Sequence, residues 1–407
     1  MPKSRYSNIS IPAIIKGARM LIPHPFIGLK LARIQAEKML FPLLNPQRKK
    51  GKARKIHQLS IRITDICNLR CHTCGQWGEN GYLRDKNLAS LREAEVSGAR
   101  YRTLFTDLVA HGHRPNLYLW GGEPTMYQDL REVLDSASAY NLPTSIVTNG
   151  HQLKSYAEAF KQAGLYLLQL SIDGHNHQLH NRLRPAVGSA DAFSQILAGL
   201  EALKELRQGR TQLPIVASLS VISKENIGHL VDIYETFKSS VDIFVFYLSW
   251  WIDEERALDH EHDFTKRFGF KPKLHRGWIG GWKPNEYEML KEQMAELRAR
   301  SHALKSTAPA VTFIPDFRTG EELRRYYTDH SETFGYSECR SIFQAVEINA
   351  NGDMSPCRDY HDYVVGNVKE QTIHELWNSE RYLEFRQSLQ REGLMPVCSR
   401  CCGLMGY

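Results

Sequence analysis

Cysteine is missing from most of this 407-residue chain, because none occurs between Cys74 and Cys339. Cysteines used as small core residues are spread along a sequence, so the gap excludes that ordinary use for the eight that are present. Long apolar runs are missing too. No run of about 18 apolar residues occurs, which excludes a transmembrane helix. The sequence also has no P-loop, no internal repeat and no low-complexity stretch.

The overall composition is that of an ordinary globular protein. Hydrophobic residues make up 42% and charged residues 24% of the chain, both near the average for soluble domains. The length suffices for two or three domains with an ample core. No secretory signal is visible, and grouped cysteines of this kind need a reducing interior, so we expect a cytoplasmic protein.

The cysteines fall into two groups. Cys67, Cys71 and Cys74 form a C-x3-C-x2-C triad, and the others, Cys339, Cys357, Cys398, Cys401 and Cys402, lie near the C-terminus. Three thiolates leave one iron of a [4Fe–4S] cluster without a protein ligand. An open position on a metal is where chemistry takes place. A zinc site is the main alternative, and a disulfide is less compatible with the spacing.

Three further motifs follow the triad in order. The strand-like run Leu59–Thr64 precedes it, and Leu117–Trp120 leads into Gly121-Gly122-Glu123-Pro124. The runs Ile146–Gly150 and Leu170–Gly174 also end in short polar segments. Together these motifs resemble those of the radical S-adenosylmethionine (radical SAM) enzymes, and the resemblance covers roughly residues 56–248. One departure is Thr73, where that family usually has an aromatic residue beside the adenine.

The resemblance implies a SAM-binding [4Fe–4S] cluster on Cys67, Cys71 and Cys74. It implies that reductive cleavage of SAM gives a 5′-deoxyadenosyl radical, which abstracts a hydrogen atom from the substrate. The implied SAM contacts are the Gly121 and Gly122 backbone and Glu123 at the methionine amine, and Ser171, Asp173 and Arg184 at the ribose and carboxylate. The plainer alternatives are a turn residue before Pro124 for Glu123, and strand-end turns for Ser171 and Asp173.

The late cysteines resemble the C-terminal SPASM domain, which carries auxiliary iron–sulfur clusters. Too few are present for the two-cluster form, so the resemblance implies a second, auxiliary [4Fe–4S] cluster held by Cys339, Cys357, Cys398 and Cys401. Aminocyclitol dehydrogenases show a similar pattern. Cys402 is a spare, and a zinc ribbon is the alternative. Four thiolates saturate a cluster, which favours electron relay over substrate binding at iron.

Strand and helix patterns alternate after the triad. Apolar runs at 58–64, 117–120, 143–148, 167–172, 215–222 and 241–248 predict buried parallel strands. Six such units predict an α/β fold, a partial (β/α)6 barrel followed by a small C-terminal auxiliary-cluster domain. The predicted domains are a basic N-terminal segment at 1–55, the barrel at 56–248, a Trp-rich insert at 249–335 and the SPASM-like domain at 336–407. The insert is either a substrate lid or a small core of its own.

The N-terminal segment is short of acids. Residues 1–55 hold 13 Lys or Arg and one acid, Glu37, interleaved with bulky apolar residues. Such a segment suits peripheral contact with an anionic membrane. The alternatives are a helix packed on the barrel with a solvated linker, an acidic protein partner, or an organelle presequence. We do not expect nucleic acid as a partner.

The leading hypothesis is a radical SAM oxidoreductase acting on a small molecule, such as a sugar, aminocyclitol or lipid-linked group. The alternative is a maturase that modifies a ribosomal peptide or a protein. A non-catalytic iron–sulfur scaffold is a third class, against which the SAM-contact motifs argue. An enzyme of this kind needs an external one-electron donor such as flavodoxin or ferredoxin. The sequence does not identify the substrate or the net reaction.

Overall fold

The computed structural model describes residue 22 and residues 24–207, 213–280, 286–302 and 308–405. One ten-stranded sheet runs through it in the order β10-β9-β8-β1-β2-β3-β4-β5-β6-β7. The strands are β1 (Gln58–Thr64), β2 (Asn116–Gly121), β3 (Thr144–Thr148), β4 (Leu167–Ser171), β5 (Ile215–Ile222), β6 (Ile243–Leu248), β7 (Ala310–Ile314), β8 (Ala345–Ile348), β9 (Asp353–Ser355) and β10 (Gly366–Asn367).

The first six strands are those predicted from the apolar runs, and all are parallel to their neighbours. Their central residues, such as Ile61, Leu119, Ile146 and Phe246, have no exposed surface. Parallel strands are covered on both faces, which explains why they appear in the sequence as continuous apolar runs. The predicted α/β partial barrel is therefore confirmed.

Four more strands extend the sheet beyond the prediction. β7 pairs in parallel with β6, and β8 pairs in parallel with β1. β9 and β10 follow as short antiparallel strands. The insert and the C-terminal region thus both contribute to the sheet of the barrel. The domain limits at 249 and 336 stay predictions, because the sheet is continuous across them.

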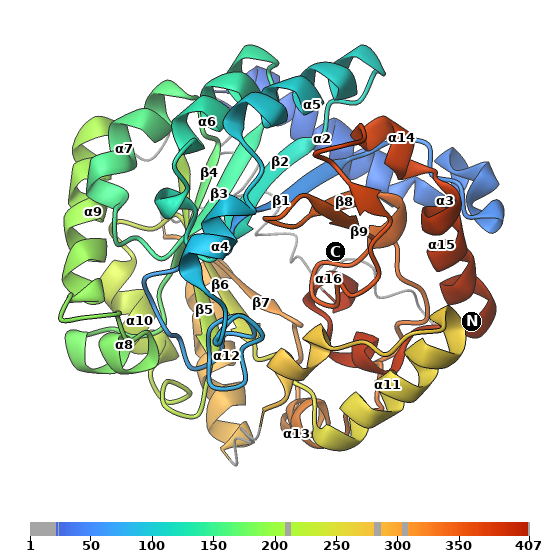
Figure 1. The fold of residues 1–407 in the computed structure, drawn as a ribbon. Helices are drawn as coiled ribbons and strands as arrows, with labels where there is room; N and C mark the ends of the chain where they lie inside the picture. The colour runs from blue at the N-terminus through green and yellow to red at the C-terminus, as the bar shows by residue number, and fades with distance from the viewer. Residues whose placement is uncertain (1–21, 23, 208–212, 281–285, 303–307, 406–407) are drawn as a thin grey trace.

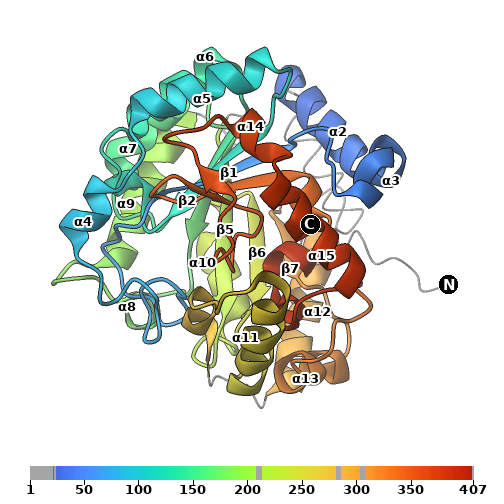
Figure 2. The ribbon, with the colours of Figure 1, turned by 45° about the vertical axis from the view of Figure 1, so that its right-hand side comes forward.

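Helices surround the outside of the sheet (Figure 1), with α5, α6, α7 and α9 along one side. The C-terminal segment lies on the other side, with α14 and α15 beside the N-terminal helices (Figure 2). The α-helices are α2 (Pro25–Met39), α3 (Phe41–Leu44), α4 (Leu88–Glu93), α5 (Gly98–Ala110), α6 (Leu130–Ala139), α7 (Leu153–Gln162), α8 (His177–Leu183), α9 (Ala192–Arg207), α10 (Leu230–Phe237), α11 (Glu254–Phe268), α12 (Tyr287–His302), α13 (Gly320–Thr328), α14 (Ile373–Trp377), α15 (Glu380–Glu392) and α16 (Cys402–Met405). Short 3-10 turns are η1 (Pro46–Lys50), η2 (Pro124–Met126), η3 (Leu274–Trp278), η4 (Ser341–Phe343) and η5 (Pro396–Arg400).

Arg386 of α15 attaches the C-terminal segment to the start of the barrel. Its guanidinium is fully buried and donates to the carbonyls of Gly51 (3.2 Å) and Ile342 (2.8 Å). It also lies over the ring of Tyr382, 3.8 Å from the centroid. Within the described part of the chain, no helix combines the length and apolar character needed to cross a bilayer.

Candidate active site

The triad lies in the loop that follows β1. The amide of Leu69 donates to the sulfur of Cys67 (3.4 Å), and the amide of Trp77 donates to that of Cys74 (3.3 Å). Arg184 places its guanidinium 3.6 Å from the sulfur of Cys71. Donors of this kind stabilise negative charge on sulfur. All three residues line one cavity of about 240 Å³, so the structure brings the predicted ligands together.

Burial governs the protonation of these thiols. It raises the pKa of Cys71 to about 11, with Arg184 opposing the shift, and it raises the pKa of Cys67 further. Without a metal both side chains are neutral thiols at neutral pH, and binding of a cluster must release their protons. The described cysteines form no disulfide with one another, so oxidation does not block the thiols of the triad.

The Gly121-Gly122-Glu123 segment supports the triad loop. The amides of Gly122 and Glu123 donate to the carbonyls of Thr64 and Ile66, both at 2.8 Å. A Cβ on Gly122 would lie 2.2 Å from the carbonyl oxygen of Ile66. The backbone therefore approaches so closely that only glycine fits, which accounts for the motif independently of any ligand.

Glu123 has the structural role considered for it, and its contact with the SAM amine stays a prediction. Its carboxylate accepts hydrogen bonds from the Thr125 amide (3.1 Å), the Thr125 and Thr148 hydroxyls (2.6 Å each) and the Asn149 amide (2.7 Å). It thus caps the η2 turn and fixes the end of β3. The residue also lines the cavity. Burial raises the pKa of this carboxyl, while the Thr125 and Thr148 hydroxyls act in the opposite direction.

Ser171, Asp173 and Arg184 differ in position. Ser171 and Arg184 line the cavity, whereas Asp173 is not part of its lining. The carboxylate of Asp173 instead accepts from Arg184 Nε (2.6 Å) and from the Val221 amide (2.8 Å). Asp173 therefore orients Arg184, and its predicted contact with the SAM ribose stays a prediction.

A second hollow, which we call the mouth, adjoins the cavity. This mouth has a volume of about 450 Å³, and Glu79, Lys224 and Glu225 contribute charges of both signs to it. The cavity and the mouth share part of their lining: Thr73, Cys74, Val221, Trp250 and Trp278. Thr73, the departure from the family pattern, thus lies where the two spaces meet, and neighbouring tryptophans supply aromatic surface there.

Trp278, in the Trp-rich insert, packs directly on the triad loop. A Cβ on Gly75 would lie 2.6 Å from the Trp278 ring, and one on Gly277 would lie 2.3 Å from the Gly75 carbonyl oxygen. The indole N–H of Trp278 donates to the carbonyl of Asp359 (3.2 Å). The insert therefore bridges the residue after Cys74 and the C-terminal segment. This contact is not apparent from the sequence.

The C-terminal cysteines share one buried neighbourhood. Burial, Asp359, Cys398 and Cys339 all raise the pKa of Cys357, and burial and Cys339 raise that of Cys398 to about 12. The thiol of Cys401 donates to the Asp359 carboxylate (3.5 Å). The set of four predicted ligands is thus grouped and free of disulfides, which fits a cluster of four thiolates. The side chain of Cys402 lies outside the described residues.

Two residues that follow Cys357 were missed by the sequence reading. Arg358 and Asp359 both line the cavity from the C-terminal side. The Arg358 guanidinium lies 4.8 Å from the centroid of the Tyr118 ring and pairs with the buried Glu347 (3.3 Å). In the sequence, the available indication of their importance was that they directly follow Cys357, a predicted cluster ligand. Asp359 contacts both the cavity and Cys401, so the two cysteine sites adjoin the same space.

Comparison with known families decides the assignment. The family model described as the radical SAM superfamily matches residues 61–237, and the SPASM model, an iron–sulfur cluster-binding domain, matches residues 339–402. This chain is a radical SAM enzyme with a C-terminal SPASM domain. The radical SAM domain binds a [4Fe–4S] cluster and SAM, and the SPASM domain binds auxiliary iron–sulfur clusters.

Relatives of this radical SAM enzyme have diverse names. An "AdoMet-dependent heme synthase" of Methanosarcina barkeri is 27% identical over 348 residues, or 84% of this chain and 87% of that protein. A "GTP 3′,8-cyclase" of Klebsiella pneumoniae is 30% identical over 155 residues, 37% of this chain and 43% of that protein. The first relative spans most of both chains, whereas the second covers only part of each.

Solved structures with the same fold include two that are similar over most of this chain. SuiB of Streptococcus suis, bound to S-adenosylmethionine, has a TM-score of 0.58 and 15% identity, covering 93% of this chain and 77% of that one. The protein anSMEcpe, with bound AdoMet and a Cp18Cys peptide, has a TM-score of 0.53 and 18% identity, covering 82% of both chains. At this identity the likeness shows the fold alone.

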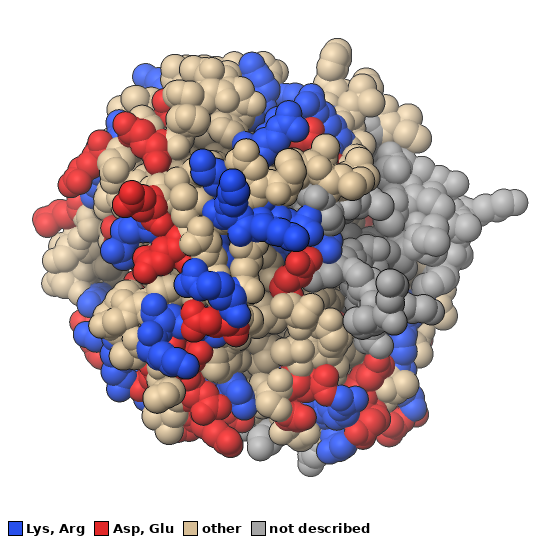
Figure 3. All heavy atoms as spheres, turned by 90° about the vertical axis from the view of Figure 1, so that its right-hand side faces the viewer, with Lys and Arg blue, Asp and Glu red and all other residues tan. Residues whose placement is uncertain are grey.

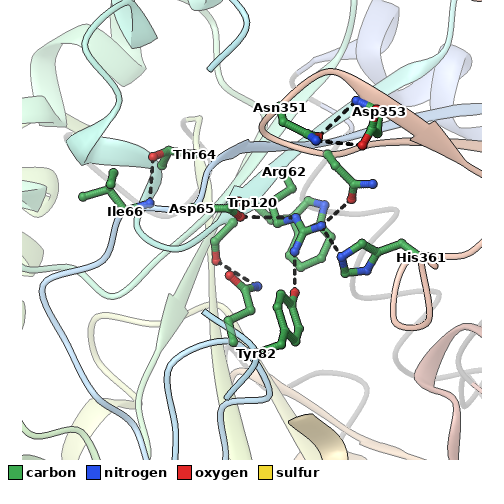
Figure 4. Close-up of polar contacts among 12 residues, drawn as sticks. Arg62, Thr64, Asp65, Ile66, Tyr82, Trp120, Asn351, Asp353 and His361 are labelled. Atoms are coloured by element: carbon green, nitrogen blue, oxygen red, sulfur yellow. Dashed lines mark hydrogen bonds and ion pairs between the residues drawn. The ribbon is translucent and has the colours of Figure 1, made fainter. Parts of the chain in front are cut away.

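A buried arginine ties the two domains of the radical SAM enzyme together. Arg62 of β1 is only 2% exposed, and Figure 4 shows its guanidinium reaching Tyr82 and His361 beside Trp120. It donates to the Tyr82 hydroxyl, to the Asn349 side-chain oxygen and to His361 Nε2 (2.6 Å). Tyr82 belongs to the loop after the triad, and the last two to the C-terminal region. Burial, together with Arg62, holds the pKa of His361 well below its usual range, so His361 accepts as a neutral ring.

Replacing Arg62 by methionine should destabilise the protein by about 3 kcal/mol, because several charge-assisted hydrogen bonds are lost inside the fold. The control is Arg102→Met, which removes an exposed ion pair with Glu132 (2.7 Å) and should cost less than about 1 kcal/mol. Denaturant unfolding under anaerobic conditions measures both. Equal stability of the two variants would contradict the stabilising role of the buried Arg62 contacts.

Proposed function

We propose that the chain is a radical SAM oxidase whose auxiliary cluster accepts an electron from the substrate. The observation that supports this proposal is the position of Asp359. Its side chain lines the cavity and accepts a hydrogen bond from the Cys401 thiol. A substrate in the cavity would therefore lie beside the auxiliary centre. Cys67, Cys71 and Cys74 are the proposed ligands of the SAM cluster, and Cys339, Cys357, Cys398 and Cys401 those of the auxiliary cluster.

The reduced cluster and SAM, when bound, supply the radical that removes a hydrogen atom from the substrate. The residues of the chain orient the reactants and exclude water. We propose that Glu123 and the Gly121-Gly122 backbone hold the methionine amine, and that Arg184, fixed by Asp173, meets an anionic part of SAM. For a desaturated or cross-linked product, a cluster held by Cys339, Cys357, Cys398 and Cys401 would supply the electron acceptor, and we propose that the Asp359 carboxylate takes the proton.

We propose a peptide or protein side chain as the substrate. The mouth is open to solvent, so one residue of a longer chain can enter while the flanking backbone stays outside and meets the charges of Glu79, Lys224 and Glu225. The structures of SuiB bound to precursor peptide SuiA and of anSMEcpe with the Cp18Cys peptide have the same fold. These comparisons support a maturase more than the small-molecule hypothesis.

A small molecule is the second candidate. The relative named AdoMet-dependent heme synthase aligns over 84% of this chain, and by its printed name it acts on a small molecule. A cavity of about 240 Å³ joined to a mouth of about 450 Å³ also has room for a sugar or an aminocyclitol beside SAM. Either substrate requires a one-electron donor, for which we propose flavodoxin or ferredoxin.

The test is the formation of 5′-deoxyadenosine by the reconstituted, anaerobic enzyme with SAM and reductant. Separate reactions receive the small-molecule, lipid and peptide or protein fractions of a cell extract. We expect the peptide or protein fraction to stimulate formation. Stimulation by the small-molecule or lipid fraction alone would contradict the maturase proposal and support the second candidate.

A further inference from the structure

Within the described part of the chain, the most exposed large apolar side chains fall between residues 22 and 43. Among the described residues, the four large hydrophobic side chains with the greatest exposure are Phe26 (83%), Leu43 (77%), Ile22 (72%) and Leu29 (71%). The next is Val187 at 59%. Single exposed apolar side chains are ordinary, but a group of the most exposed ones within one short stretch marks an interaction surface.

The helix that carries Phe26 and Leu29 is attached to the barrel through Lys30 and Glu37. On α2 these two residues are three positions apart and therefore share a face. Glu37, further along α2, lies 3.5 Å from His57 and 3.8 Å from Lys55, which both precede β1. Lys30 donates to the carbonyl of Asn141, in the loop before β3. The helix is thus fixed at the N-terminal ends of the strands, while Phe26 and Leu29 in its first turns stay largely exposed.

Basic side chains accompany this apolar face. Residues 22–55 contain nine Lys or Arg and one acid, Glu37, whose carboxylate already pairs with Arg33 at 3.0 Å. Figure 3 shows basic side chains gathered on the side of the molecule where α3 and α15 lie in Figure 1. There Lys49 and Arg391 line a shallow hollow of about 430 Å³.

We propose that α2, α3 and η1 form a docking surface, and that this docking surface binds an anionic lipid bilayer. Amphipathic segments of this type bury their apolar side chains at the headgroup boundary while Lys and Arg meet the phosphates. Nucleic acid would satisfy the positive charge but leave the apolar side chains exposed. A second copy would bring two basic surfaces together and be repelled.

The position of the docking surface also determines which way the mouth of the active site faces relative to the bilayer. The surface lies at the N-terminal ends of the parallel strands, whereas the triad, Glu123 and Ser171 lie at or beyond their C-terminal ends. The mouth therefore opens away from the bilayer. The contact anchors the enzyme, and the substrate reaches the mouth from the aqueous side.

The test is co-sedimentation of the full, cluster-loaded chain with vesicles of phosphatidylcholine alone or with a third of phosphatidylglycerol. We expect binding to the anionic vesicles only, and its loss at high salt. The triple variant Lys49→Gln, Lys50→Gln, Lys52→Gln should weaken partitioning about fivefold for each lysine removed. The variant Phe26→Ser, Leu29→Ser, Leu43→Ser should weaken it about tenfold or more.

The matched control is Val187→Ser with Leu258→Ser, which removes exposed apolar side chains elsewhere (59% and 52% exposed) and should leave binding unchanged. Iron content and circular dichroism establish that each variant is folded. Absence of binding by the unmodified chain, or equal binding by the apolar variant and the control, would overturn the proposal. So would a dimer in solution that only the apolar variant dissociates.

Discussion

Replacing Cys71 by alanine is expected to abolish the formation of 5′-deoxyadenosine from SAM. Cys71 is the middle ligand of the proposed SAM cluster, and its sulfur lies 3.6 Å from the Arg184 guanidinium. Loss of an outer partner of a metal ligand lowers activity or metal affinity by about 10- to 100-fold. Loss of the ligand itself should therefore exceed about 100-fold. Liquid chromatography of anaerobic, dithionite-reduced reactions measures the effect.

The control for this prediction is Cys402→Ala, which removes the cysteine that the ligand assignment leaves over. We expect that variant to cleave SAM at the wild-type rate and to keep its full iron content. SAM cleavage by the Cys71 variant within a few-fold of wild type would refute the assignment of the triad.

Replacing Cys357 by alanine is expected to separate SAM cleavage from product formation. Cys357 lies in the buried group with Cys339 and Cys398. Its loss removes a ligand of the proposed auxiliary cluster but leaves Cys67, Cys71 and Cys74 in place. The variant should form 5′-deoxyadenosine with the stimulating fraction yet give no oxidised product, because the substrate radical has lost its electron acceptor.

Mass spectrometry of the substrate, with the 5′-deoxyadenosine yield as reference, measures this separation. Turnover equal to that of the unmodified enzyme would rule out the electron-relay role. Loss of SAM cleavage as well would show that the two cysteine sites are not independent. The Arg62 contacts to Tyr82 and His361 are one route by which damage could spread, so the stability of the variant is measured in parallel.

Sequence patterns were sufficient for the barrel because its strands are long and buried on both faces. Leu59–Thr64 and Ile215–Ile222 are runs of mostly apolar or small residues, interrupted in the first by the buried Arg62. The strands that the sequence missed are short or depend on distant partners. β8 has four residues and forms a strand because β1 offers it a free edge. β7 likewise pairs with the edge at β6, and its apolar run Ala310–Ile314 was a local signal that the strand prediction missed.

The triad and the Gly-Gly-Glu segment were recognisable because the residues of each motif lie close together in the sequence, within a single loop. Asp359 and Trp278 were not, because their importance arises from contacts between distant segments. Trp278 lies against Gly75, about two hundred residues earlier, and bonds to the carbonyl of Asp359. Asp173 illustrates the opposite case: its motif drew attention, yet it orients Arg184 and does not line the cavity.

The most direct test of the account is electron paramagnetic resonance of the anaerobically reduced enzyme with and without SAM. The account predicts two reduced-cluster signals. One, lost in the Cys71 variant, changes when SAM binds at the open iron, and the other, lost in the Cys357 variant, does not respond to SAM. A single signal, zinc in place of iron at the C-terminal cysteines, or an iron-loaded enzyme whose spectrum SAM leaves unchanged would contradict it.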